Sequence, residues 1–318
     1  MLRRVGKSVA VSAAAASAAG VVALYVDAPR SDVGDGRYEE HHHTPVFPEW
    51  LHDLGRAPIF AAATLASKVY MLGLNRTEVQ GSDILIDQLE KKPKKTSLIT
   101  VSNHSATVDD PGVIATMMPW KFAWPSNGRW SLCSQEYCYT KGRMLSAVFF
   151  GAKTLPVKRG GGVDHKMLSD IFDKVEEGKW VHIFPEGKIE QNELLGGRKS
   201  PLREEIGRLK WGVGKLIARA TERPIVIPFY HANMEKIMPQ NASNQLISIM
   251  PKTGVHVRVV VGEPISFDDL FEKYAKDRVA GGARWKTQDR ERALYSAITR
   301  RIEKALLELE RRTRAPQQ

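Results

Sequence analysis

Cysteine is scarce in this sequence. It contains only Cys133 and Cys138, and no second pair follows them. A single pair at this spacing is a poor zinc site and no disulfide framework, so we expect both residues to pack as small apolar side chains. Three histidines at 41–43 stand in a segment rich in proline, glycine and acids, and we expect an exposed linker there. The sequence therefore predicts neither a metal site nor another cofactor.

Signatures of nucleic-acid binding are also missing. The net charge of +11 over 318 residues would suit either nucleic acid or an anionic membrane surface. There is no zinc spacing, no aromatic RNA-binding signature and no basic recognition helix. A membrane surface is therefore the expected partner, although basic runs are often merely solvated and the charge alone does not establish it.

Acidic residues are absent before Asp27. Residues 1–26 instead combine basic residues with many alanines and serines, which is typical of a mitochondrial transit or sorting segment. Residues 9–26 are uncharged, but they contain too little Leu, Ile or Phe to insert strongly into a membrane. A cleaved presequence and a weak anchor both remain open, and residues 1–48 are assigned to this segment and a linker.

A strongly apolar segment follows the linker. Residues 57–74 contain one charge, Lys68, and apolar residues recur at roughly helical spacing from Pro48 onward. A buried core helix would fit, but the position ahead of the first strand favours a helix at 49–75 that lies in a membrane interface. Full spanning is less expected, because glycine and alanine dilute a short run.

Strands and helices alternate through residues 76–266. Short β-branched apolar runs predict strands at 97–102, 131–133, 154–158, 180–184, 225–230 and 255–261. Amphipathic patterns predict helices between them, most clearly at 82–90, 164–177 and 204–220. This alternation predicts a single α/β domain at 76–266, a mostly parallel mixed sheet flanked by helices. Residues 267–318 are expected to form a C-terminal helical extension.

Polar groups follow several of these strands. The strand at 97–102 leads into Asn103 and His104, and Asp109 stands five positions after the histidine. The other strand ends carry Arg159 with three glycines, Glu186 with Gly187, and His231. Because the carboxyl ends of parallel strands share one crevice, we expect these groups to converge.

His104 and Asp109 suit general-base chemistry. A carboxylate that accepts a hydrogen bond from one imidazole nitrogen fixes the tautomer and leaves the other nitrogen as a base. No serine or cysteine nucleophile stands in a recognisable motif beside them, which favours catalysis on the substrate's own hydroxyl. Asp110 and Pro111 are expected to cap the next helix and leave Asp109 free. On this stretch alone, a capped surface turn with a chance histidine fits equally well.

The other strand ends suit a phosphate-bearing alcohol. Arg159 on its glycine-rich loop could hold a phosphate through two hydrogen bonds, with help from loop amides. Glu186 could hold a hydroxyl or order the loop at Gly187. His231 is interpreted as a satisfied core histidine. With a basic chain and an interfacial helix, this combination describes a lysophospholipid acceptor.

The motifs resemble a known family. Asn103-His104-x4-Asp109, residues 156–160 (Pro-Val-Lys-Arg-Gly) and residues 184–187 (Phe-Pro-Glu-Gly) resemble the glycerolipid acyltransferases with the His-x4-Asp motif. Residues 180–188 and 208–218 resemble more closely the phospholipid–lysophospholipid transacylases of that family. The resemblance covers about residues 57–265.

The resemblance implies an acyltransferase domain on a membrane surface that needs no coenzyme A. It implies His104 as the base with Asp109 as its partner, and an acceptor site formed by Asn103, Arg159, Gly160, Glu186 and Gly187. It also implies phospholipid and lysophospholipid substrates, notably cardiolipin and monolysocardiolipin. The implied location is the inner or outer mitochondrial membrane, facing the intermembrane space, with a cardiolipin-rich anionic surface as partner.

Two positions, 188 and 189, distinguish the coenzyme-A-independent transacylases from the alternative that uses coenzyme A. Relatives that use coenzyme A usually place Thr-Arg after the Phe-Pro-Glu-Gly segment, whereas this chain has Lys188 and Ile189, which favours the transacylases. An acyl-CoA-dependent lysophospholipid (1-acylglycerol-3-phosphate) acyltransferase is the alternative. A peripheral membrane-binding protein with a vestigial site is a third possibility, and the role of the loop at 188–201 is open.

Overall fold

The computed structural model describes residues 2–29, 44–191, 209–241 and 243–315, and for residues 2–13 only the backbone. The expectations for the histidines at 41–43 and for most of the loop at 188–201 lie outside the described residues.

The main sheet is mixed and mostly parallel, which confirms the predicted fold class. Within the described residues it has five strands in the order β1-β7-β6-β2-β5. The strands are β1 (Arg76–Gln80), β2 (Leu98–Ser102), β5 (Trp180–Ile183), β6 (Ile225–Ala232) and β7 (His256–Val261). Strand β2 pairs in parallel with β5 and β6, whereas β7 runs antiparallel to β6 and parallel to β1.

A shorter parallel pair continues the sheet beyond β5. It consists of β3 (Ser131–Ser134) and β4 (Thr154–Val157). Trp130, just before β3, pairs in parallel with Val181 of β5 and links the pair to the main sheet. Strands β2, β4, β5 and β6 therefore run in one direction, and their carboxyl ends lie at the same edge.

Strand β1 was missed by the sequence analysis, whereas every strand it predicted is present with ends shifted by at most two residues. The sequence of β1, Arg-Thr-Glu-Val-Gln, has a single large apolar residue, Val79. Such a polar sequence is common at the edge of a sheet, where one side of the strand has no partner. The local pattern therefore could not reveal it.

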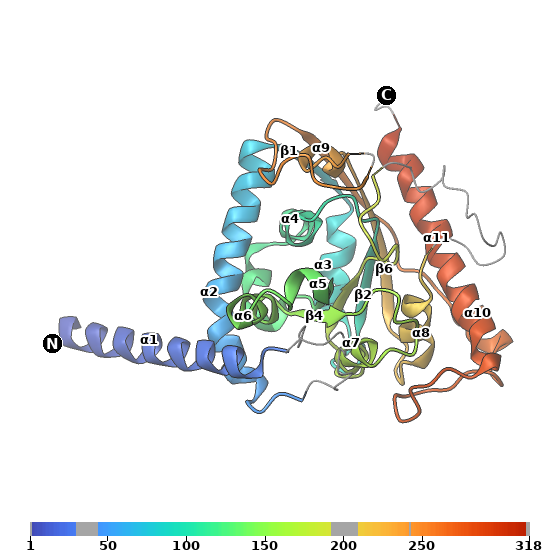
Figure 1. The fold of residues 1–318 in the computed structure, drawn as a ribbon, viewed down its shortest axis with the longest axis horizontal. Coiled ribbons are helices and arrows are strands. Elements are labelled where there is room, and N and C mark those ends of the chain that lie inside the picture. Colours follow the sequence, from blue (N-terminus) through green and yellow to red (C-terminus); the bar gives the residue numbers. More distant parts are fainter. Residues whose placement is uncertain (1, 30–43, 192–208, 242, 316–318) are drawn as a thin grey trace.

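Helices cover both faces of the sheet (Figure 1). They are α3 (Ser82–Lys91), α4 (Asp109–Met117), α6 (Arg143–Gly151), α7 (Lys166–Glu176), α8 (Gly212–Arg219), α10 (Asp268–Lys273) and α11 (Arg292–Arg314). Alternate residues of β2 face opposite cores, because side chains of a strand point alternately to its two faces. Ile99 and Val101 pack with α7, α8 and α11, and Leu98 packs with α3 and α4.

The N-terminal segment forms two helices that cross closely. Helix α1 (Leu2–Asp27) meets α2 (Glu49–Lys68) at Gly20 and Gly55, where an added Cβ on either glycine would lie within 2.5 Å of the other's backbone. Leu24 and Ala28 belong to the buried core. Figure 1 shows the rest of α1 extending away from the body of the protein.

Helix α2 continues into the π-helical turn η1 (Val69–Leu74). Among the described residues, Glu49–Leu74 is the only helix long and apolar enough to cross a membrane, judged by length and composition. Little of its apolar stretch is buried, and Figure 1 shows α2 running along the side of the body. A helix placed in this way can also lie in the membrane interface.

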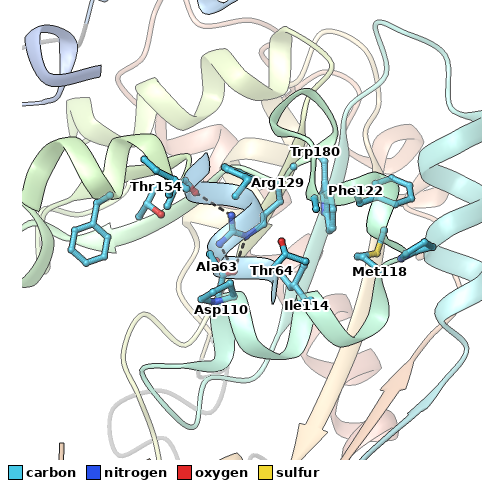
Figure 2. A pocket seen from close by; sticks show the side chains of 18 residues that line it. Ala63, Thr64, Asp110, Ile114, Met118, Phe122, Arg129, Thr154 and Trp180 are labelled. Atoms are coloured by element: carbon cyan, nitrogen blue, oxygen red, sulfur yellow. Dashed lines mark hydrogen bonds and ion pairs between the residues drawn. The ribbon is translucent and has the colours of Figure 1, made fainter. Parts of the chain in front are cut away.

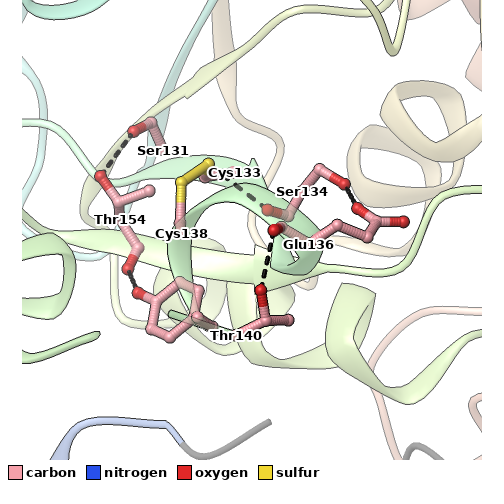
Figure 3. The surroundings of a disulfide bond; sticks show 8 residues. Ser131, Cys133, Ser134, Glu136, Cys138, Thr140 and Thr154 are labelled. Carbon is pink, nitrogen blue, oxygen red and sulfur yellow. Dashed lines mark hydrogen bonds between the residues drawn. A yellow bond between two sulfur atoms is a disulfide. The ribbon is translucent and has the colours of Figure 1, made fainter. Parts of the chain in front are cut away.

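The expectation for the two cysteines was wrong. Cys133 and Cys138 form a disulfide, drawn in Figure 3, and do not pack as separate apolar side chains. The one-turn helix α5 (Gln135–Cys138) directly follows β3 and reverses the chain, which brings the two Cα atoms to 6.2 Å. That separation is within the range that a disulfide spans. Spacing along the sequence did not reveal this tight turn.

Candidate active site

The loop that follows β2 brings His104 and Asp109 together. His104 Nδ1 lies 3.0 Å from Asp109 Oδ2, and the same oxygen accepts hydrogen bonds from the backbone N–H groups of Ser105 (2.6 Å) and Ala106 (2.8 Å). The Asp109 side chain is 1% exposed and the His104 side chain 20% exposed. When Nδ1–H donates to the carboxylate, Nε2 of the accessible imidazole is left as the proton acceptor.

Asp109 is held in its ionised form. Burial would raise the pKa of this carboxyl, but the charge of His231 and the hydrogen bonds from His104 and from the backbone of Ala106 favour the anion. The net effect is a pKa below the ordinary value. A buried, ionised carboxylate stabilises an imidazolium at His104, which a general base requires.

His231 reaches the same carboxylate from β6. It is fully buried, its Nε2 donates to the carbonyl oxygen of Asn103 at 3.0 Å, and that nitrogen lies 3.6 Å from Asp109 Oδ2. The interpretation as a core histidine thus describes its burial and this hydrogen bond, but the ring is not fully satisfied, because its Nδ1 is buried with no hydrogen-bond partner among the described residues. The interpretation also omits the contact with Asp109, which needs the register of β2 against β6 and was not visible in the sequence.

The side chain of Asn103 joins the ends of β2 and β6. Its Oδ1 accepts from the backbone N–H of His231 at 3.0 Å, and its Nδ2 donates to the carbonyl oxygen of His231 at 2.9 Å. The same Nδ2 also donates to Ser105 Oγ at 3.1 Å. The amide is therefore occupied within the protein, and its geometry supports a role in ordering the loop. Contact of Asn103 with substrate stays a prediction.

The end of β5 forms the other wall of the site. Glu186 Oε1 accepts from the backbone N–H of His104 at 3.0 Å, and the ring of Phe184 stacks on the imidazole with 4.0 Å between centroids. Gly187 has φ +71°, a conformation that glycine adopts without strain. Beyond it, Glu190 N–H donates to the His104 carbonyl at 2.9 Å. Glu186 thus fixes the backbone of the loop that carries His104.

Asp110 differs from its expected capping role. Helix α4 begins at Asp109, and Asp110 interrupts it with φ −115° and ψ 113°. The Asp110 carboxylate accepts from Arg129 Nε at 2.7 Å, in an ion pair that is almost buried. Asp109 nevertheless points away from this pair and toward the histidines, so the two neighbouring acids have separate partners.

Arg159 stands at the same edge of the sheet, two residues after the end of β4. Its side chain is exposed, and its guanidinium carbon lies 5.2 Å from the ring centroid of Tyr137. Gly160 follows with φ +74° and open space where a Cβ would stand. Within the described part of the chain, Arg159 forms no ion pair with an acidic side chain.

An apolar cavity adjoins the Asp110–Arg129 ion pair (Figure 2). Its volume is about 130 Å³, and α2, α4 and the segment 118–129 line it. The lining residues include Phe60, Ala63, Ile114, Met118, Phe122 and Trp180. Pro111 lines the cavity two residues after Asp109, so the cavity begins close to the candidate catalytic loop.

Metal chemistry has no evident site in the described ranges. No group of three or more His, Cys, Asp or Glu side chains there could hold a metal ion.

Comparison with known proteins identifies the family. Residues 83–232 match the Acyltransferase family model. The N-acylphosphatidylethanolamine synthase of Arabidopsis thaliana is 36% identical over 69% of this chain and 73% of its own length. The tafazzin of Drosophila melanogaster is 32% identical over 70% of this chain and 54% of its own length, and the taffazin of Dictyostelium discoideum 30% over 74% and 79%.

The chain belongs to the glycerolipid acyltransferase family, in its tafazzin branch. This confirms the family resemblance seen in the motifs. It is an acyltransferase, and its activity is of the phospholipid acyltransferase or transacylase type.

Three contacts of the site were not predicted from the sequence. Phe184 stacks on His104, His231 approaches Asp109, and Arg129 pairs with Asp110. Phe184 lies inside a recognised motif, so its presence was visible while its contact was not. Arg129 was visible only as a basic residue in an aromatic-rich segment, because its partner is 19 positions away.

Proposed function

We propose that this protein is a coenzyme-A-independent transacylase that moves acyl chains between phospholipids and lysophospholipids, including the conversion of monolysocardiolipin to cardiolipin. The observation that carries the proposal is the oriented pair of His104 and buried Asp109. No serine or cysteine in the described ranges hydrogen-bonds to the His104 side chain, so the pair supports direct attack by the acceptor's own hydroxyl.

In the proposed reaction, the acceptor hydroxyl gives its proton to His104 Nε2 as its oxygen attacks the ester carbonyl of the donor phospholipid. The bond between the acyl carbon and the donor oxygen then breaks. The proton passes from the imidazolium to the leaving oxygen, which yields a lysophospholipid. Asp109 stabilises the imidazolium throughout. Atoms and charge balance without a coenzyme.

The acceptor site is proposed at the carboxyl ends of β2, β5 and β4, which lie at the same edge of the sheet. Arg159 would bind the acceptor phosphate with help from the backbone at Gly160, since a guanidinium and exposed amides match phosphate oxygens. Glu186, Gly187 and Asn103 would shape the loop around the acceptor hydroxyl. The apolar cavity beside α2 is proposed to take the start of an acyl chain.

Membrane attachment is proposed through α2 and its surroundings. Leu65, Val69 and Leu72 on this segment are each more than half exposed, and Lys68 lies against the exposed Trp120. Exposed apolar, aromatic and basic side chains together suit a membrane interface with anionic lipids. If a chain that begins at Arg76 still pelleted with cardiolipin-containing vesicles, this assignment would be wrong.

A mitochondrial location facing the intermembrane space is part of the proposal. Its support is the basic, acid-free N-terminus together with the tafazzin relatives. The Cys133–Cys138 disulfide adds support, because disulfides persist in compartments more oxidising than the cytosol.

The deciding assay needs no acyl-CoA. Purified protein is mixed with phosphatidylcholine vesicles that contain monolysocardiolipin, with and without acyl-CoA, and the products are resolved by mass spectrometry. We expect cardiolipin and lysophosphatidylcholine in both samples, and neither with His104→Ala. Strict dependence on added acyl-CoA would instead establish the 1-acylglycerol-3-phosphate type of acyltransferase. If His104→Ala kept all of the protein's function, a peripheral membrane-binding protein with a vestigial site would be favoured.

A second acceptor deserves the same assay, because the Arabidopsis thaliana relative is named N-acylphosphatidylethanolamine synthase. The same base could take a proton from an attacking amine, which would form an amide in place of an ester. Vesicles containing phosphatidylethanolamine would then yield N-acylphosphatidylethanolamine, a product that differs in mass from any transacylated phospholipid.

A further inference from the structure

We infer that Tyr137, held by the Cys133–Cys138 disulfide, is a positioning residue that presents Arg159 to the phosphate of the acceptor lipid. The inference rests on the proposed role of Arg159. It assigns a function to an exposed aromatic residue and to a disulfide that the reaction itself does not use.

The two residues meet because β3 and β4 are parallel neighbours. Ser134, the last residue of β3, is level with Val157, the last residue of β4. Tyr137 lies in the turn just after β3 and Arg159 in the turn just after β4, which places the guanidinium carbon 5.2 Å from the ring centroid. At this distance a guanidinium is attracted to the face of an aromatic ring.

The contact leaves the binding groups of Arg159 accessible. A guanidinium that lies on a ring keeps its N–H groups in its own plane, where they can donate to phosphate oxygens. No acidic side chain within the described ranges forms an ion pair with Arg159, so no carboxylate there competes with a ligand. The ring therefore restricts the arginine without occupying its donors.

The position of Tyr137 depends on the disulfide. Helix α5 has only four residues, too few to be stable by itself. The disulfide closes the chain from Cys133 to Cys138 around Tyr137, and Figure 3 shows it bridging the end of β3 and the end of α5. The next residue, Tyr139, is buried, and its hydroxyl donates to the carbonyl oxygen of Thr154 in β4.

Tyr137 itself is 57% exposed. Its ring thus contributes little to the core, and its contact with Arg159 is the feature that a substitution would disturb. A fixed arginine loses less conformational freedom when it binds a ligand than a free one does, which strengthens binding. The contact should therefore act on acceptor affinity and not on the chemical step.

The test separates these two effects. Initial rates are measured for Tyr137→Ala and Tyr137→Phe as the concentration of lysophospholipid acceptor is varied at saturating donor. For Tyr137→Ala we expect the acceptor KM to rise about two- to five-fold, the factor that an exposed cation–π contact supplies, with kcat unchanged. Tyr137→Phe keeps the ring and should retain the original KM.

Arg159→Ala provides the coupling measurement. We expect its acceptor KM to rise about ten- to a hundred-fold, as for the loss of a charge-assisted hydrogen bond. Adding Tyr137→Ala to Arg159→Ala should then raise KM no further, because the ring has lost its partner. A further rise in the double variant, or an unchanged KM in Tyr137→Ala, would overturn the inference.

The disulfide is tested with Cys133→Ser/Cys138→Ser and with dithiothreitol. The dithiol supplies two electrons and two protons, reduces the disulfide to two thiols and itself becomes a cyclic disulfide. Reduction of the native protein and the double substitution should both raise the acceptor KM to the level of Tyr137→Ala. Dithiothreitol should not affect the double variant. An unchanged KM in both would show that the disulfide does not position Tyr137.

Equilibrium binding distinguishes failure of this inference from failure of the proposed function. Binding of 1-acylglycerol-3-phosphate in detergent micelles is measured without any acyl donor. A protein that transfers no acyl chain but binds this lipid in a manner dependent on Tyr137 and Arg159 would support the inference and refute the transacylase. A protein that transfers acyl chains but binds this lipid equally well without Tyr137 would support the transacylase and refute the inference.

Discussion

Asp109 and Asp110 are neighbours in the chain, yet their buried carboxylates have different partners. Asp109 Oδ2 lies 3.0 Å from the imidazole of His104, whereas Asp110 Oδ1 accepts from Arg129 Nε at 2.7 Å. The extended backbone of Asp110 separates the two. One acid therefore belongs to the candidate catalytic pair, and the other to an ion pair at the wall of the apolar cavity.

Asp109→Asn is expected to lower kcat by about 10²- to 10⁴-fold, the usual contribution of a positioned base. The amide cannot stabilise an imidazolium and can hold His104 in the wrong tautomer. Transacylation rates in vesicles measure the effect, with vesicle binding as the control for intact attachment. A variant that kept most of its kcat would exclude the pair as the catalytic base.

Asp110→Ala should act mainly on stability. Both members of its ion pair are nearly buried, with side-chain exposures of 7% for Asp110 and 9% for Arg129. Removing the acid leaves a buried guanidinium without its partner, which costs about 3–5 kcal/mol. Urea unfolding in detergent micelles measures the loss, and the exposed Asp268, paired with Arg223, provides the matched control Asp268→Ala with little effect.

His231 is expected to position Asp109 and the loop at Asn103. His231→Leu removes one of two donors to the Asn103 carbonyl, which then keeps only the Ser102 hydroxyl, and the lost hydrogen bond costs about 0.5–1.5 kcal/mol. His231→Gln can still donate at that position and should recover most of kcat. A pH–rate profile separates positioning from general destabilisation, because loss of the His231 contact should shift the profile of His231→Leu. Equal profiles for the native protein and both variants would show that His231 serves packing alone.

The features that could not be predicted from the sequence depend on contacts between residues that lie far apart in the chain. The apolar runs predicted each strand with a buried centre, because a short continuous run of apolar residues is a local feature of the sequence. Strand β1 was missed because its stability comes from pairing with β7, about 180 positions later. His104 and Asp109 were identified from spacing and motif, since a short loop brings them together. The contact of His231 depends on the register of β6 against β2, and that of Arg129 on a partner 19 positions away in α4, and no local pattern encodes either.

Folding should become less favourable in acid through His182. Burial lowers the pKa of this side chain from 6.5 to about 4, so the folded protein binds its proton more weakly than the unfolded chain does. The folded state therefore favours the neutral imidazole. The free energy of unfolding has its full value above pH 6.5 and decreases as the pH falls to about 4, because protons then bind more tightly to the unfolded chain. The total change is about 3 kcal/mol. Urea unfolding from pH 4 to 7 measures it.

His182→Gln should remove this part of the pH dependence. His256, which is exposed on β7, provides the control, because His256→Gln leaves the buried histidine in place. The native slope should therefore persist in His256→Gln and flatten in His182→Gln. The same slope in all three proteins would assign the acid sensitivity to other groups.

The second half of α1 is expected to be part of the folded domain. Leu24 is buried in the core, and the Asp27 carboxylate lies 2.8 Å from His52 Nε2 and accepts from the backbone N–H groups of Val46 and Phe47. Removal of residues 1–28 would expose the core around Leu24, a loss of about 2–5 kcal/mol, and would leave His52 without its buried acid. Removal of residues 1–13 leaves all of these contacts in place.

Urea unfolding of the two truncated chains in detergent micelles tests this directly. The chain that begins at residue 14 should unfold at the same urea concentration as the full chain, and the chain that begins at residue 29 at a clearly lower one. The same pair of chains reports on processing: a presequence cut that preserves the fold is expected to lie before Gly20, where α1 packs closely against Gly55 of α2. Equal midpoints for both truncated chains would show that α1 contributes nothing to the domain and could be removed entirely.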